Sequence, residues 1–119
     1  MTRSTATRVA AGLGFLAVLL GAFGAHGLKP LLGHNGTTGI WEKAVFYHFI
    51  HTVVLYAIAQ KQPLMKWPFG FFLAGIVIFS GSLYLLAVTD ILWLGAITPV
   101  GGLCLLAGWA ALFVAAKKD

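Results

Sequence analysis

Four long apolar runs, separated by short polar linkers, constrain the fold of this chain more than any other feature. The runs lie at about residues 9–28, 41–60, 68–88 and 93–116. Each is about 20 residues long or slightly longer, which is enough to cross about 30 Å of hydrocarbon as a helix. Because backbone groups in lipid must be hydrogen-bonded within the protein, irregular structure is excluded there. The sequence therefore predicts an all-α fold, a polytopic transmembrane four-helix bundle that forms a single domain over residues 1–119.

The composition is that of a membrane protein. Of the 119 residues, 60% are hydrophobic and only 9% are charged, whereas a soluble domain of this size needs more charge to cover its surface. The net charge of +5 comes from basic residues that flank the apolar runs singly or in pairs. They form no basic face of the kind that binds nucleic acid. We therefore expect the lipid bilayer, and no nucleic acid, as the partner.

The basic residues also predict the orientation. With four crossings, the N-terminus, the linker between the second and third runs, and the C-terminus share one side of the membrane. That side carries six basic residues, and the other side carries only Lys29 and Lys43. By the positive-inside rule we expect both termini on the cytoplasmic side. The six are Arg3, Arg8, Lys61, Lys66, Lys117 and Lys118.

The first run has a second interpretation. Arg3 and Arg8 precede an apolar stretch that ends in small residues at 21–25, a pattern that is also found in signal peptides. We expect an uncleaved first helix.

Polar side chains gather at one level of the expected bundle. His48 and His51, one helical turn apart, share a face of the second helix, and Ser80 and Tyr84 share a face of the third. Ionisable groups at membrane depth are costly and usually functional. With one residue each from the first and fourth helices, they predict a polar pocket in the outer half of the bundle. The candidate ligand-binding residues are His26, His48, His51, Ser80, Tyr84 and Thr98.

Several kinds of site fit these residues. One is a buried hydrogen-bond network that satisfies each histidine, and another is a site that titrates or binds a small molecule, lipid or ion, since histidine changes charge near neutral pH. A metal ion needs three or four ligands, and only His26, His48 and His51 are candidates. Haem held by two histidines needs a wide cavity. No cofactor is firmly implied, and without a carboxylate pair or nucleophile motif we expect no enzyme.

Small residues recur at steps of three and four along the helices. They allow close backbone approach, which drives helix association in lipid. They predict either tight packing inside the bundle or a face that forms a homo-oligomer or docks, as a structural or accessory subunit, onto a larger membrane complex. The glycines in question are Gly14, Gly21, Gly24, Gly70, Gly81, Gly95, Gly101, Gly102 and Gly108.

The linkers and one proline complete the expected helix boundaries. Asn35-Gly36-Thr37 is predicted to be a flexible loop, and Thr89 or Asp90 is predicted to cap the fourth helix. Pro99, in Thr98-Pro99-Val100-Gly101-Gly102, predicts a kink or local unwinding in the outer half of that helix.

Four segments, in order and spacing, resemble the domain-of-unknown-function family 423, which includes bacterial inner-membrane proteins. The resemblance covers nearly the whole chain, from about Gly12 to Ala115. It implies a small four-span membrane protein without an established activity, and it implies that the six candidate residues belong to the family pattern. It assigns no catalytic or metal-binding role. The segments are Gly21-Ala22-Phe23-Gly24-Ala25-His26, Tyr47-His48-Phe49-Ile50-His51-Thr52, Phe79-Ser80-Gly81-Ser82-Leu83-Tyr84, and Thr98–Gly102 with Gly108-Trp109.

Overall fold

The computed structural model describes residues 1–116, so the prediction that rests on Lys117 and Lys118 lies outside the described residues. The all-α prediction is confirmed, and no strand occurs within residues 1–116. The segments Lys66–Gly75, Ile76–Ser80 and Gly81–Thr89 follow one another without a break as one long helix. The elements are α1 (Arg3–Ala25), α2 (Lys29–Asn35), α3 (Thr38–Ala59), α4 (Lys66–Gly75), the π-helical η1 (Ile76–Ser80), α5 (Gly81–Thr89), the 3-10 helix η2 (Leu92–Ala96) and α6 (Thr98–Ala115).

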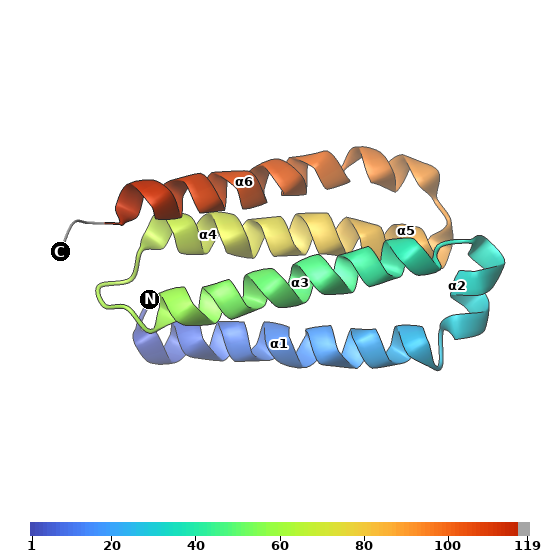
Figure 1. The fold of residues 1–119 in the computed structure, drawn as a ribbon, viewed down its shortest axis with the longest axis horizontal. Coiled ribbons are helices and arrows are strands. Elements are labelled where there is room, and N and C mark those ends of the chain that lie inside the picture. The colour runs from blue at the N-terminus through green and yellow to red at the C-terminus, as the bar shows by residue number, and fades with distance from the viewer. Residues whose placement is uncertain (117–119) are drawn as a thin grey trace.

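The long helices lie side by side in a bundle that measures 52 × 26 × 21 Å (Figure 1). α1 packs mainly against α3, and α6 packs mainly against α4 and η1. α3 also contacts α4, η1 and α5, so these helices form the centre of the molecule. α1 begins and α6 ends at the same end of the bundle as the α3–α4 linker, while α2 covers the opposite end (Figure 1).

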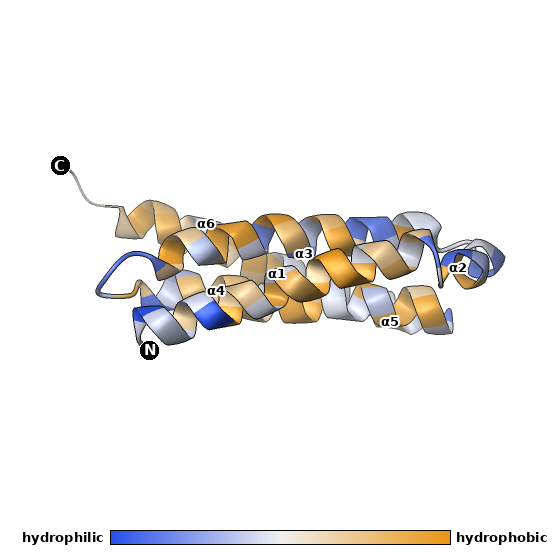
Figure 2. Cartoon of the chain, turned by 90° about the horizontal axis from the view of Figure 1, so that it is seen from below, coloured by the Kyte–Doolittle hydropathy of each residue, from blue (hydrophilic) through white to orange (hydrophobic). Residues whose placement is uncertain are grey.

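Three helical stretches are long and apolar enough to cross a membrane: Arg3–Ala25, Lys66–Thr89 and Leu92–Ala115. Their outward surfaces carry large apolar side chains, such as Phe15 on α1 and Phe113 on α6, which are 70% and 84% exposed. Hydrophobic residues dominate the long helices, whereas the α3–α4 linker is largely hydrophilic and α2 is mixed (Figure 2). α3, with 22 residues, is nearly as long as these stretches but is not one of the three. It carries Glu42, Lys43 and the two central histidines, which lower its hydropathy.

Small residues allow two close helix contacts, one between α1 and α3 and one between α6 and the long helix α4–η1–α5. In α1, Ala6, Ala10 and Ala17 are at most 1% exposed and turn toward α3. A side chain at Gly24 would collide with the indole of Trp41, whose Nε1–H donates to the Leu20 carbonyl over 2.9 Å.

The contact between α6 and the long helix α4–η1–α5 involves backbone as well as side chains. An added Cβ at Gly101 would lie 2.6 Å from Phe79 Cα, and one at Gly108 would lie 2.8 Å from the Phe72 ring. These glycines therefore serve contacts within the chain.

The linker at Asn35–Thr37, predicted to be a flexible loop, is ordered instead. It follows a short helix whose Leu32 is fully buried. The Asn35 amide donates to the carbonyls of Ala87 and Val88 over 3.1 and 3.2 Å, and the Thr37 hydroxyl donates to Ala87 over 2.7 Å. Because the last carbonyls of a helix lack intrahelical partners, this linker satisfies the end of α5 and ties α2 to it.

The start of the fourth apolar run also differs from the expectation. It begins as the 3-10 helix η2, and α6 starts only at Thr98, with Pro99 in its first turn, where a missing N–H costs little. The chain is thus locally unwound before the proline. The predicted cap is wrong: Asp90 adopts a left-handed conformation (φ 57°) at the end of α5, and no side chain caps η2.

Candidate functional site

His48 lies inside the protein, with 4% of its surface exposed. Its Nδ1 is 2.8 Å from the Tyr84 hydroxyl on α5, and the Tyr84 ring packs on Trp41 with centroids 4.7 Å apart. If the hydroxyl donates, its proton is satisfied and the imidazole carries its own proton on Nε2. Nε2 is buried and has no hydrogen-bond partner within residues 1–116. His48 therefore has a hydrogen bond at one ring nitrogen and none at the other, which costs free energy in an apolar interior.

His51 is fully satisfied. Its Nδ1 is 2.8 Å from the Tyr47 carbonyl, and since a carbonyl only accepts, Nδ1 carries the proton. Its Nε2 accepts from the Trp109 indole over 3.1 Å, which joins α3 to α6. Phe72 lies against the same ring, with centroids 5.7 Å apart. His51 is thus a neutral hydrogen-bonded link between helices.

The hydroxyl residues also form links. Ser80, 1% exposed, donates to the Ala44 carbonyl over 2.8 Å and joins η1 to α3. Ser82 donates to the Phe79 carbonyl over 3.0 Å, so the Thr98 hydroxyl, 2.7 Å away, must be the donor to Ser82. The π-helical turn at Ile76–Ser80, which the sequence did not predict, lies beside these groups. Such turns often mark functional sites.

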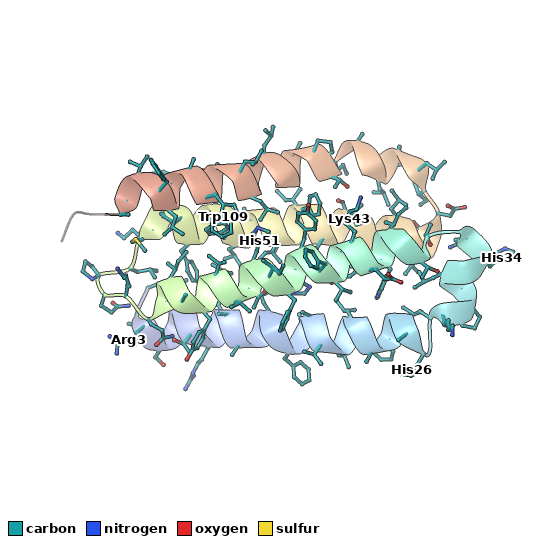
Figure 3. All side chains as sticks on the ribbon, in the orientation of Figure 1. Arg3, His26, His34, Lys43, His51 and Trp109 are labelled. Carbon is teal, nitrogen blue, oxygen red and sulfur yellow. The ribbon has the colours of Figure 1, made fainter. Side chains whose placement is uncertain are left out.

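The six candidate residues therefore do not meet in one pocket. His48 pairs with Tyr84 and His51 with Trp109. His26 follows the last residue of α1 and has an exposed side chain. It lies at the end of the bundle next to α2, away from the labelled pair His51 and Trp109 (Figure 3). His51 is about 20 Å along α3 from Thr38, near the middle of the bundle and not in one half.

A metal ion or a bis-histidine haem does not fit this arrangement. No group of three His, Cys, Asp or Glu side chains suited to a metal occurs within residues 1–116. Both ring nitrogens of His51 are engaged, as is Nδ1 of His48. A ligand of either kind would have to break these hydrogen bonds.

A lateral groove of about 540 Å³ opens between α3 and α6, with His51 in its wall. Its walls combine aromatic and aliphatic side chains, and the ring centroids of Tyr47 and Phe79 lie 4.6 Å apart. Tyr47, Phe79 and Trp109 are functional candidates that sequence reasoning missed, although they stand within the segments that carry the family resemblance. The lining residues are Tyr47, His51, Phe79, Pro99, Gly102, Leu103, Leu105, Leu106 and Trp109.

Comparison with known proteins places the chain in a family. The model of the family described as "Protein of unknown function (DUF423)" matches residues 20–102. The UPF0382 membrane protein YwdK of Bacillus subtilis is 42% identical over 112 residues, which cover 87% of this chain and 88% of YwdK. The UPF0382 inner membrane protein YgdD of Escherichia coli K12 is 41% identical over 110 residues, 88% of this chain and 83% of YgdD.

A UPF0382 membrane protein of Staphylococcus epidermidis is 43% identical over 107 residues, 87% of each chain. No solved structure matches this chain. The apolar helices and the relatives agree on a multi-pass membrane protein. The chain belongs to the DUF423 family.

Proposed function

We propose that this chain is a non-enzymatic protein of the bacterial inner membrane that binds a lipid-soluble small molecule in the groove between α3 and α6. The groove itself is the observation that carries the proposal. Its volume of about 540 Å³ falls within the range of known ligand sites, about 300–1,000 Å³. It opens sideways between two helices, so a ligand enters from the bilayer.

The chemistry of the walls favours binding over catalysis. Tyr47, Phe79 and Trp109 offer ring faces and edges, which pack well against a flat or unsaturated apolar ligand. Both nitrogens of His51 are occupied by Tyr47 and Trp109, so His51 shapes the groove and is not free to accept a proton from a substrate.

The rival function is an accessory subunit that docks onto a larger complex through its glycine faces. Gly24, Gly75, Gly101 and Gly108 already contact neighbouring helices within this chain, which leaves those faces less suited to a partner. Purification of the protein in mild detergent distinguishes docking onto a complex from ligand binding.

Filling the groove is expected to remove the ligand. A Cβ at Gly102 would meet the Phe79 ring at 3.8 and 3.9 Å, which is an ordinary contact. The side chain of Gly102→Leu can therefore fill the groove without pushing α6 away from its neighbours. In native mass spectrometry after purification in mild detergent, the wild type is expected to retain a small molecule. Gly102→Leu is expected to retain about tenfold less, since an overfilled site loses roughly 1–3 kcal/mol.

Gly12→Leu in α1 is the matched control, because nothing lies within 4 Å of a Cβ at Gly12. Equal retention by both variants contradicts the proposal. A stoichiometric protein partner with no retained small molecule supports the rival.

Four crossings with both termini in the cytoplasm are the second part of the proposal. α3 lies between α1 and the long helix α4–η1–α5, both of spanning length, and burial there shields its histidines from lipid. Arg3, Arg8, Lys61 and Lys66 belong to the termini end of the bundle, as the positive-inside rule requires of a cytoplasmic side.

Reporter fusions test this topology. Alkaline phosphatase fused at the C-terminus is expected to be inactive and a fluorescent protein fused there to be bright. Alkaline phosphatase fused after His34, in α2, is expected to be active, because that end faces the periplasm. An active phosphatase at the C-terminus rules the orientation out, and an inactive one after His34 rules out the first crossing.

A further inference from the structure

A second groove runs along the junction of α1 and α3, away from the first. It consists of two adjoining hollows of about 420 and 340 Å³, which share Gly21, Val45 and Phe46. Along α3 the groove extends from Thr38 to Ile50, about 18 Å at 1.5 Å per residue. The part from Glu42 to Ile50 is about 12 Å long, which is most of half the hydrocarbon thickness, about 15 Å, and suits one acyl chain of one leaflet.

The packing of the two helices leaves this groove open. α1 contributes the small residues Ala17, Gly21, Gly24 and Ala25 to its walls. Trp41 cannot move in to fill the space, because its ring packs over Gly24 and its Nε1–H is bonded to the Leu20 carbonyl. The small residues of α1 therefore leave a space that Trp41 does not fill.

The mouth of the groove is polar and lies at the end of the bundle that α2 covers. Thr38 and Glu42 are both exposed there, one helical turn apart on α3. A carboxylate beside an apolar channel complements a lipid headgroup that carries a primary ammonium, which can donate charge-assisted hydrogen bonds. Glu42 lines the groove, whereas the cations at this end of the bundle, Lys29 and Lys43, do not. The quaternary ammonium of choline has no N–H to donate.

We infer that this groove is a site for phosphatidylethanolamine, with one acyl chain between α1 and α3 and the ammonium at Glu42. The site is separate from the groove between α3 and α6 and does not depend on the function proposed for it.

Photocrosslinking in nanodiscs tests the inference. The full-length protein is reconstituted with phosphatidylethanolamine that carries a diazirine in its acyl chain, and the crosslinked peptides are mapped by mass spectrometry. Crosslinks are expected to concentrate at residues 17–25 and 38–50, with about threefold to tenfold more product than from the matching phosphatidylglycerol probe.

Two pairs of variants locate the site. Ala25→Phe places a ring in the hollow of about 420 Å³ and is expected to remove most of these crosslinks. Ala22→Phe is the control, because Ala22 is exposed on α1 and lies outside both hollows, and it is expected to leave the crosslinks unchanged. Glu42→Gln is expected to abolish the preference for ethanolamine over glycerol headgroups. Asp90→Asn removes the same charge at the same end of the bundle and is expected to preserve it.

Equal labelling by both probes in the wild type overturns the headgroup assignment, and crosslinks spread evenly over α1, α3 and α6 overturn the site. Gly102→Leu serves as the check between the two grooves. It is expected to leave crosslinking at α1 and α3 unchanged, so the two proposals can fail separately.

Discussion

Gly101→Ala is expected to lower the free energy of unfolding by about 2–3 kcal/mol, whereas Gly102→Ala, one residue further on, is expected to raise it slightly. A Cβ at Gly101 would overlap the Phe79 backbone, with Phe79 Cα only 2.6 Å away, and backbone cannot yield as a side chain can, so α6 must move away from η1. At Gly102 the methyl group meets only the edge of a ring at 3.8 Å. There alanine keeps its advantage over glycine inside a helix, about 1 kcal/mol or less.

The two variants differ by one position and by no chemistry, so the comparison isolates the helix contact. Unfolding of the detergent-solubilised protein, followed by circular dichroism during a denaturant titration, measures both changes. If Gly101→Ala is as stable as Gly102→Ala, then α6 does not approach η1 as closely as the structure places it.

The positions of the long helices followed from the sequence, because apolar length and backbone satisfaction in lipid leave few choices. The short helix α2 lies in a predicted linker and was missed. The ends did not follow equally well. α1 begins at Arg3, six residues before the apolar run, because Thr2 caps it through a hydrogen bond to the Thr5 amide of 3.1 Å. The π-helical turn at Ile76–Ser80 could not be predicted from hydrophobic periodicity. One extra residue in a single turn hardly changes a pattern that repeats every 3.6 residues.

The roles of the glycines could be predicted only in kind. Their spacing indicated close helix contacts, but spacing does not say whether the neighbour belongs to the same chain. In the structure, Gly24 packs against Trp41 of α3 and Gly108 packs against Phe72 of α4. Which helix packs against a given glycine depends on the tertiary arrangement, and the sequence of one helix does not specify it.

The candidate site followed from the sequence only in part, for a geometric reason. Residues three apart on a helix differ by about 60° from a full turn, so His48 and His51 share a buried face but point to different neighbours. One meets Tyr84 of α5 and the other Trp109 of α6. His26 was expected at the end of the first helix and is there, but its side chain is exposed and does not reach the buried histidines.

The pair His48 and Tyr84 is expected to contribute little net stability, although each member alone is costly to remove. His48→Met leaves the buried Tyr84 hydroxyl without an acceptor, and Tyr84→Phe leaves His48 Nδ1 without a donor. Each single variant is expected to lose about 1–2 kcal/mol of unfolding free energy. The double variant removes both partners and also the unpartnered Nε2 of His48, so it is expected to unfold within about 0.5 kcal/mol of the wild type, or at higher denaturant.

Thr52→Val is the control, because Thr52 is equally buried and its hydroxyl donates only to the His48 carbonyl of its own helix. Loss of that bond is expected to change stability by less than about 0.5 kcal/mol. A double variant that is weaker than both singles means that the pair stabilises the fold, and that Nε2 of His48 is satisfied in the membrane. A double variant as stable as the wild type means that packing does not require the histidine, and any loss of cellular phenotype in that stable protein then assigns His48 and Tyr84 a role in function.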